Sequence, residues 1–307
     1  MRTILRAVLL TIIVAIASSC HTTRQAEGRK TVDNALQNSV DSLLRGKPAM
    51  VGVAVSYGGR MLCEVNGDRE FPMMSVFKLH QAIAVLDSIG KAKGSLTDSI
   101  DITAAMLRPN TYSPLRDRYP HGGIRMSIEE LLRYTLWLSD NNACDILFDR
   151  FGGTAYANAL MERLGLRHTQ IRWTEDEMHQ APTRCADNFT TPCEALLILE
   201  KSFADEWLKS TLYDCQTGKN RLPALLPPGT MVGHKTGTGD PTADGLQCGI
   251  NDIGFVKLPN GSHFYIAVFC DHARMTMPET ESLIAQIARL AYEHITASQT
   301  ARPVSKQ

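Results

Sequence analysis

The sequence predicts an α+β protein, in which an antiparallel sheet of about five strands is flanked by helices and carries an inserted all-helical domain. Two observations lead to this prediction. Segments with the alternating pattern of strands lie near both ends of the chain, at residues 51–65 and 229–270, and segments with helical periodicity occupy most of the chain between them. Strands from both ends can share one sheet when the intervening helices form a separate domain. We expect the functional site at the junction of the two, where clefts form.

Length and composition set the domain boundaries that we expect. The chain has 307 residues, 44% of them hydrophobic and 21% charged, which suits one large domain or two interleaved ones. We assign residues 1–20 to a signal peptide, 31–66 and 217–296 to a discontinuous sheet domain, 67–216 to an all-helical domain that includes a long loop at 166–191, and 297–307 to a tail.

The N-terminus has the features of an export signal. Arg2 and Arg6 precede an uncharged run at residues 7–17. This run is too short to span a bilayer, which takes about 20 residues, but is typical of a signal-peptide core. Ala-Ile-Ala at 15–17 fits cleavage after small residues, whereas Ser-Ser-Cys ending at Cys20 resembles the bacterial lipoprotein signal. We favour a lipid-modified Cys20, and expect an exported protein in the bacterial periplasm, anchored there by its lipid.

Charge and cysteine content exclude several classes of function. Without the first 20 residues, 32 − 2 = 30 basic residues face 32 acidic ones, a net charge of −2, so we expect no nucleic-acid partner. Seven cysteines remain, without any C-x-x-C pair, which argues against a zinc ribbon or a redox motif. Cys185 and Cys193 are the first pair to test for a disulfide. The histidines form no metal-binding spacing, and Cys270-Asp271-His272 is interpreted as a strand end, so we expect no metal and no cofactor.

The first mature elements are a helix and a hairpin. Valine and leucine recur at helical spacing over residues 31–45, and Gly46 follows. Residues 51–57 and 61–65 alternate as strands on either side of a Gly-Gly turn, which is typical of a two-residue hairpin loop.

The next helix begins at Ser75. Apolar residues recur from Val76 to Ile89 at three- and four-residue spacing, and Gly90 ends the run. Ser75 therefore lies in the first turn, where Lys78 projects from nearly the same face. A serine hydroxyl becomes a nucleophile when a nearby base takes its proton, and a lysine can be that base when burial or a cationic neighbour lowers its pKa. A helix-capping serine beside a solvated lysine would give the same pattern, so other motifs must decide.

The remaining elements follow in order. Residues 94–123 are expected to be mainly loop, and Ser127 opens a helix with the serine-to-glutamate spacing of a capping box. Residues 166–191 have no regular period and form a loop of a length that is usually functional. Further helices are expected at residues 143–151, 154–164, from 192, at 205–215 and from 278, and further strands at 229–235, 246–258 and 263–270.

Four short motifs stand in order along the chain: Ser75-x-x-Lys78, Ser139-Asp140-Asn141, Glu175 in the long loop, and Lys235-Thr236-Gly237. Together they resemble the class A serine β-lactamases, whose S-x-x-K, S-D-N and K-T-G motifs are known, and among these the cephalosporinase-type, extended-spectrum branch. The resemblance extends over residues 31–296. It implies a monomeric hydrolase that opens the β-lactam ring of penicillins and cephalosporins, preferably cephalosporins, through a serine acyl-enzyme and so confers antibiotic resistance.

The resemblance implies a role for each motif residue. Ser75 would be the nucleophile, and its backbone N–H would form the oxyanion hole with that of Thr238. Ser139, near Lys78 and Lys235, would pass a proton to the departing lactam nitrogen. Glu175 would activate the water that hydrolyses the acyl-enzyme, and whether Glu175 or Lys78 is the base for acylation stays open. Substrate contacts are implied for Tyr112, Asn141, His179, Arg221, Thr236, Gly237 and Thr238.

The long loop departs from the family pattern. Met178 and His179 replace the usual leucine and asparagine of E-x-x-L-N, and Glu177 is a rival to Glu175 as the base. The distance of 17 residues from Glu175 to Pro192 matches the family and favours Glu175. The arginine and aspartate that usually clamp the loop are displaced: Arg172 comes one place early and Asn188 takes the acidic position. The conformation of the loop therefore stays open.

Two other functions are compatible with a Ser-Lys pair. A D,D-peptidase or penicillin-binding protein acts on cell-wall peptide and would lack a deacylating glutamate on the long loop. A β-lactam sensor domain stays acylated, and such domains usually follow a transmembrane segment, which the sequence does not contain.

Overall fold

The computed structural model describes residues 32–300. The predicted signal peptide with Cys20, and residues 301–307, lie outside this range. Residues 297–300, which the sequence assigns to a tail, are instead the last residues of a helix, α11 (Met277–Thr300).

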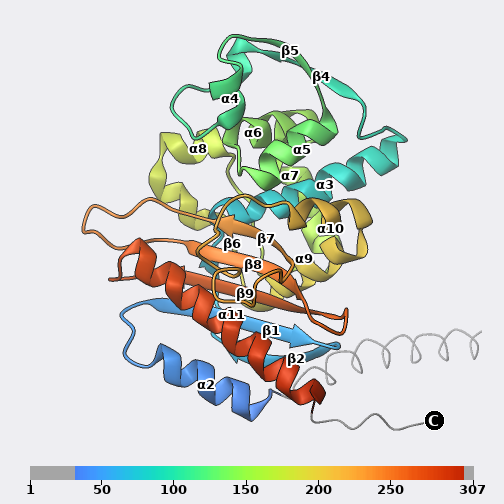
Figure 1. Cartoon of the computed structure of the whole chain (residues 1–307). Helices are drawn as coiled ribbons and strands as arrows, with labels where there is room; N and C mark the ends of the chain where they lie inside the picture. The colour runs from blue at the N-terminus through green and yellow to red at the C-terminus, as the bar shows by residue number, and fades with distance from the viewer. Residues whose placement is uncertain (1–31, 301–307) are drawn as a thin grey trace, which may run out of the picture.

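A five-stranded antiparallel sheet forms the centre of the lower half of the molecule (Figure 1). Its strands lie in the order β2-β1-β9-β8-β7, so the first hairpin pairs directly with strands from the end of the chain. The fold class predicted from the sequence is confirmed. The strands are β1 (Met50–Tyr57), β2 (Arg60–Val65), β7 (Val232–Gly237), β8 (Ile250–Lys257) and β9 (His263–Asp271).

Helices cover both faces of this sheet. On one face α2 (Asn34–Leu44) and α11 pack their apolar side chains against the valines and isoleucines of β1 and β9 (Figure 1). On the other face α9 (Pro192–Ala204) contacts β1, β8 and β9. Pro192 occupies the first turn of α9, and the Thr191 side chain caps it by accepting a hydrogen bond from the Glu194 N–H, as the sequence predicts.

The upper half of the molecule is mainly helical, and its central element is α3 (Phe77–Ala92) (Figure 1). Phe77, Leu79, Ala82 and Val85 are all buried in the core that this half shares with the sheet. The other helices are α4 (Pro114–Arg118), α5 (Ile128–Trp137), α6 (Asn141–Arg150), α7 (Gly153–Arg163), α8 (Glu175–Gln180) and α10 (Glu206–Tyr213), with short 3₁₀ turns η1 (Met74–Val76), η2 (Ala104–Met106) and η3 (Pro182–Asp187).

Two short ladders and one helix end differ from the sequence expectation. The segment expected to be loop contains a hairpin of β4 (Ser99–Thr103) and β5 (Gly122–Ser127), and β3 (Phe71–Pro72) pairs with β6 (Phe189–Thr190). The insertion is therefore helical with two added ladders. Helix α3 also continues through Gly90, because a glycine inside a helix costs only about 1 kcal/mol, and it ends at Lys93 in the left-handed region.

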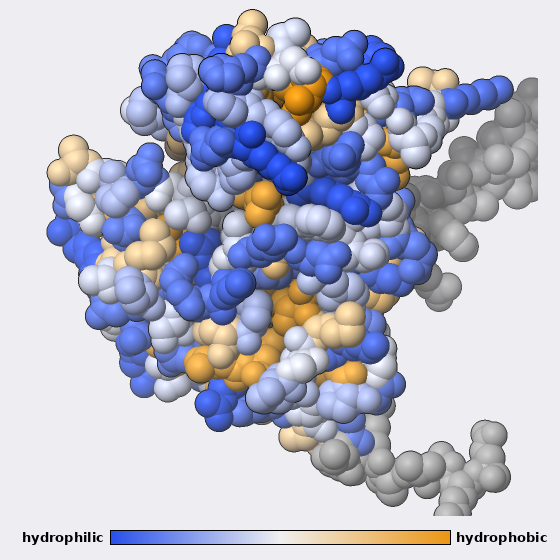
Figure 2. Space-filling model, turned by 45° about the horizontal axis from the view of Figure 1, so that its top comes forward, coloured by the Kyte–Doolittle hydropathy of each residue, from blue (hydrophilic) through white to orange (hydrophobic). Residues whose placement is uncertain are grey.

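Hydrophilic residues predominate on the face shown in Figure 2, and hydrophobic ones gather in several separate groups. Large hydrophobic side chains with an exposed fraction above a third include Met106, Tyr112, Leu225 and Met231. No helix within residues 32–300 has the length and apolar character needed to cross a membrane.

Candidate active site

Ser75 lies in the 3₁₀ turn η1, immediately before α3. The sequence predicts that the α-helix begins at Ser75, whereas in the structure it begins two residues later, at Phe77. The preceding residue, Met74, has a left-handed φ of 46°, which turns the chain sharply at this point. The Asn251 side chain donates to the carbonyls of Pro72 and Met73 and so ties the turn to the central sheet. Ser75 is thereby held at the junction of sheet and helices.

Lys78 is completely buried and occupies the centre of a polar network. Its Nζ donates to Ser75 Oγ at 2.9 Å and to the Ser139 carbonyl at 2.8 Å, and also to Asn141 Oδ1. It forms an ion pair with Glu175 Oε1 at 2.8 Å. A helix-capping serine beside a solvated lysine is therefore excluded.

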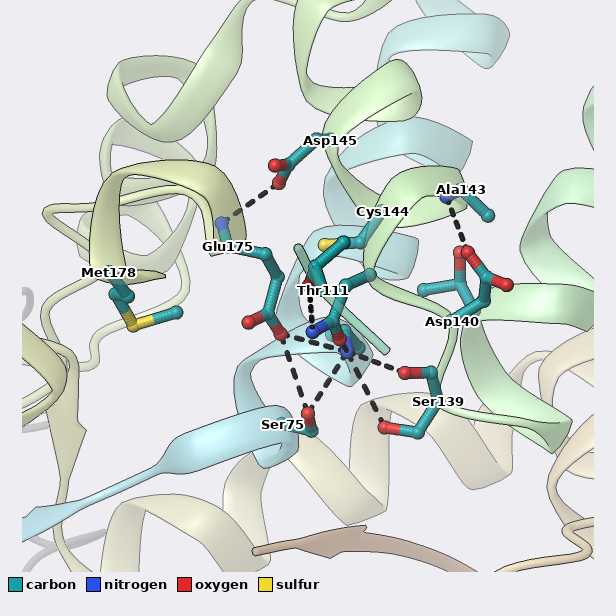
Figure 3. A network of polar contacts seen from close by, with 12 residues as sticks. Ser75, Thr111, Ser139, Asp140, Ala143, Cys144, Asp145, Glu175 and Met178 are labelled. Atoms are coloured by element: carbon teal, nitrogen blue, oxygen red, sulfur yellow. Dashed lines mark hydrogen bonds and ion pairs between the residues drawn. The ribbon is translucent and has the colours of Figure 1, made fainter. Parts of the chain in front are cut away.

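Glu175 is the first residue of α8 and points its carboxylate toward Ser75 (Figure 3). The same carboxylate pairs with Lys78. The Ser75 hydroxyl donates to Glu175 Oε1 over 3.4 Å. Asp145 positions this residue from α6, because its carboxylate accepts hydrogen bonds from the N–H groups of Glu175 and Asp176 at 2.9 and 2.8 Å. Burial, and then the charge of Glu175, raise the pKa of Asp145 to about 7.

Glu177, the rival to Glu175, has a different role. Its carboxylate accepts hydrogen bonds from the Thr174 N–H at 2.9 Å and the Thr174 hydroxyl at 3.0 Å, and so completes a capping box at the start of α8. The geometry thus favours Glu175 over Glu177 as the group that faces Ser75.

Ser139 and Lys235 lie on the other side of Ser75. Lys235 is completely buried in β7, and its Nζ donates to Ser139 Oγ at 3.0 Å and to the Thr236 carbonyl at 2.9 Å. Ser139 has a left-handed φ of 59°, and the next residue, Asp140, holds this turn by accepting hydrogen bonds from the Ala143 and Leu115 N–H groups. A chain of contacts therefore joins Lys235, Ser139 and Lys78.

Arg221 lies behind the Lys235-Thr236-Gly237 strand with only 4% of its surface exposed. Its guanidinium donates to the carbonyls of Gly237 and Asn251 at 2.8 and 2.9 Å and to Thr238 Oγ1 at 2.7 Å. It also pairs with Glu281 at 3.1 Å. Arg221 thus contacts Thr238, another predicted substrate-binding residue, and orients its side chain.

All the predicted substrate contacts except Gly237 line the same cavity. The Asn141 side-chain amide donates to Thr111 Oγ1 at 2.8 Å, and His179 Nδ1 donates to the Glu175 carbonyl at 2.8 Å. Tyr112 is 57% exposed at the rim. The cavity has a volume of about 400 Å³ and is lined by Ser75, Tyr112, Ser139, Asn141, Glu175, His179, Arg221, Thr236 and Thr238, among others.

Similarity to known proteins decides the family. Residues 33–295 match the family model described as the beta-lactamase enzyme family. A β-lactamase of Bacteroides uniformis is 37% identical over 294 residues, which cover 93% of this chain and 97% of that protein. The crystal structure of a class A β-lactamase from Bacteroides cellulosilyticus superposes with a TM-score of 0.84 at 36% identity, covering 88% of this chain and 100% of that one. The chain belongs to the class A serine β-lactamases. It is accordingly a hydrolase that acts on β-lactams and confers resistance to them.

This β-lactamase is also similar to the extended-spectrum β-lactamase TLA-1. The crystal structure of that enzyme superposes with a TM-score of 0.83 at 38% identity, and the match covers 86% of this chain and 99% of that chain.

The site of this β-lactamase includes three residues that the sequence reasoning missed. Asp145 lies four residues after Asn141 on one face of α6, so helical spacing from the Ser139-Asp140-Asn141 motif was the signal for it. Thr111 binds Asn141, and Thr217 forms a 2.7 Å hydrogen bond with the Thr236 hydroxyl. Thr217 had no signal in the sequence, because its neighbourhood depends on how the segment before β7 folds back onto that strand.

The long loop of this β-lactamase is held by an amide. Asn188 is completely buried, its Oδ1 accepts hydrogen bonds from the N–H groups of Arg172 and Trp173, and its Nδ2 donates to the Trp173 carbonyl at 2.8 Å. Arg172 is exposed, and Arg184 instead stacks on the Trp173 ring at 4.3 Å. The loop is thus closed without the arginine–aspartate pair that the family pattern would supply.

No disulfide joins the seven mature cysteines, which all lie within residues 32–300, so the structure does not link Cys185 to Cys193. Cys185 lines the active-site cavity from η3, whereas Cys193 lies in α9.

The activity should depend on pH through Lys235. Burial, and then the charge of Lys78, lower the pKa of Lys235 to about 7, so its positive charge is present below about pH 7 and is lost above it. Because a positive Lys235 favours an anionic substrate, we expect kcat/KM, which reports the free enzyme, to fall as the pH rises through this value. Steady-state kinetics from roughly pH 6 to 9 test this. Lys235→Arg, which keeps its charge, should remove the alkaline fall. If kcat/KM fell equally with pH in the wild-type enzyme and in Lys235→Arg, the pH dependence would belong to another group.

Proposed function

We propose that Ser75 attacks the lactam carbonyl carbon and that one base receives its proton, either Lys78 in its neutral form or the Glu175 carboxylate. The observation that carries this proposal is the position of Lys78 Nζ, 2.9 Å from Ser75 Oγ and 2.8 Å from Glu175 Oε1. The oxyanion is stabilised by the backbone N–H groups of Ser75 and Thr238. The lactam C–N bond then breaks, and the nitrogen takes the proton of Ser139, which Lys78 and Lys235 both contact. The proton taken from Ser75 replaces that of Ser139 by way of Lys78, so Glu175 is a carboxylate again when the acyl-enzyme has formed.

Glu175 then serves as the general base of the second step. It takes a proton from a water, the resulting hydroxide attacks the acyl carbon, and Ser75 leaves with a proton from its network. The substrate carboxylate is bound by Thr236 and Thr238 with Arg221 and Lys235 behind them. Asn141 binds the side-chain amide of the substrate, and Tyr112 and His179 border the cavity. The contact between Glu175 and Ser75 favours this hydrolase over a D,D-peptidase or a sensor, because neither needs a base at this place.

We propose a preference for cephalosporins within this activity. Its support is the similarity to an extended-spectrum enzyme, the hydroxyl of Thr238 at the carboxylate site, and the loop in which Met178 and His179 replace the family residues. The purified protein should turn over a chromogenic cephalosporin far beyond one equivalent, with kcat/KM values for cephalosporins above those for penicillins. A penicillin with a higher kcat/KM than every cephalosporin tested would contradict the preference, and a single turnover would contradict hydrolysis.

We further propose that the enzyme is an exported monomer, anchored to the periplasmic side of a membrane by a lipid on Cys20. The basis is the Ser-Ser-Cys motif after an uncharged core. A single acyl chain binds membranes only marginally, whereas several chains bind stably. Cys20→Ser should therefore move the protein from the membrane fraction to the soluble periplasmic fraction of expressing cells. Membrane association that survives this substitution would contradict the anchor.

A further inference from the structure

A second cavity lies between the β1–β2 hairpin and α9, away from Ser75. Its volume is about 180 Å³, and it is lined by residues of β1, β2, the following turn and α9. Three potential metal ligands meet there, because the ligand atoms of Glu64, Asp68 and Cys193 all lie within 4.8 Å of one another. Cys193 lies far from Glu64 and Asp68 in the sequence, which is why local spacing predicted no metal site.

The backbone around this cluster is built to bring the three side chains together. Asn66, at a left-handed φ of 48°, turns the chain after β2, and its side chain donates to the Val51 carbonyl at 2.7 Å. The Gly67 carbonyl then accepts a hydrogen bond from the Cys193 N–H at 3.0 Å. A Cβ at Gly67 would lie 2.7 Å from the Glu64 carboxylate, so glycine is needed for that carboxylate to occupy its place.

A buried hydroxyl without a partner points to a missing ligand. Ser56 follows Ala54 by two residues on β1 and so shares its face, which packs toward α9, and it lines the cavity. Only 6% of Ser56 is exposed, and its Oγ has no hydrogen-bond partner among the described residues. A buried hydroxyl left unpaired costs about 1 to 3 kcal/mol, which a bound water or ligand in the cavity would recover.

We propose that Glu64, Asp68 and Cys193 bind a zinc ion in this cavity. Thiolate and carboxylate ligands suit zinc, whereas calcium and magnesium take oxygen ligands and more of them. Zinc ligands lie about 2.0 to 2.3 Å from the ion. Side-chain rotations that bring the three ligand atoms about an ångström closer to one another would therefore let all three bind one zinc ion. A water fills the fourth position and is hydrogen-bonded by Ser56.

Charge supports a dication here. Within residues 32–300 no ion pair joins the carboxylate of Glu64 or Asp68 to a cation. Arg60 and Glu200 line the same cavity, so one positive charge stands against three carboxylates and a thiolate, a net charge of −3. A zinc ion would reduce this net charge to −1. The zinc ion would also link the β1–β2 hairpin to α9, the helix that packs on this face of the sheet.

Cobalt titration of the whole mature protein tests the site, because a thiolate bound to Co²⁺ absorbs in the near ultraviolet. Protein stripped with a chelator and kept reduced should develop this absorption up to one equivalent of Co²⁺, and Zn²⁺ should displace it. Cys193→Ser should abolish the band, whereas the control Cys185→Ser should keep it. Ser56→Ala should weaken Zn²⁺ binding about 10- to 100-fold, as the loss of a group that orients a ligand does.

Two further measurements separate this site from incidental binding. Zn²⁺ should raise the Tm of the wild-type protein and of Cys185→Ser but not that of Cys193→Ser. Cys193→Ser should hydrolyse a chromogenic cephalosporin at the wild-type rate, which shows that it is folded. The proposal is overturned by a band that persists in Cys193→Ser, by Ca²⁺ binding in preference to Zn²⁺, or by saturation only at millimolar metal.

Discussion

Ser75→Ala should abolish hydrolysis of every β-lactam that the enzyme accepts, while the protein stays folded. In the proposed mechanism the Ser75 hydroxyl forms the covalent bond to substrate, and no other group in the cavity replaces it. We expect kcat to fall by at least ~10⁴-fold, or about 5 kcal/mol of barrier. The stability should change by only about 1 kcal/mol, because the hydroxyl lost takes part in two hydrogen bonds, one from Lys78 and one to Glu175.

Mass spectrometry and thermal unfolding check this prediction together. The variant should show no adduct after incubation with a cephalosporin, while the wild-type enzyme shows a transient one. Turnover retained together with a normal unfolding transition would move the nucleophile away from Ser75.

Glu175→Ala should convert the enzyme into one that acylates and stays acylated. Ser75 keeps Lys78 at 2.9 Å and can still attack, but the group expected to activate the deacylating water is gone. General-base assistance contributes typically ~10²- to 10⁴-fold, or about 3 to 5 kcal/mol, so the acyl-enzyme should outlive the wild-type one by that factor. Kinetics should show a burst of one equivalent followed by a near-zero steady rate, with the drug on the Ser75 peptide.

Glu177→Ala is the matched control for this experiment. Its carboxylate caps α8 and does not face Ser75, so its loss should cost roughly 1 kcal/mol of stability with little effect on deacylation. If Glu177→Ala trapped the adduct while Glu175→Ala turned over normally, the assignment of Glu175 as base would be wrong, and those of His179 and Asn188 with it.

Periodicity and turn residues were enough to predict most of the fold. The sheet drawn from both ends of the chain follows from alternating segments at residues 51–65 and 229–270. The β4–β5 hairpin was missed because each strand has only two apolar residues in alternation and the chain between them is long. Such a short pair of strands depends on tertiary contacts with the helices beneath it, and these contacts cannot be predicted from a local sequence pattern.

The site was predictable where a motif carries its own geometry. Lys78 follows Ser75 by three residues, and helical geometry alone brings the two together. The side chains that orient the motif residues were harder to predict. Asp145 reaches Glu175 across 30 residues and Arg221 reaches Thr238 across 17, and such contacts depend on how separate elements pack.

The uncharged Asn188 side chain that holds the long loop should affect the salt and pH conditions in which the loop stays closed. A loop closed by an ion pair loosens at high ionic strength, which screens the pair, and at acid pH, which protonates the carboxylate. Asn188 closes this loop with hydrogen bonds between an uncharged amide and the backbone, so neither salt nor a proton can weaken the closure directly. The contacts of Asn188 with Arg172 and Trp173 should therefore persist in strongly saline and mildly acidic surroundings, which weaken an ion pair.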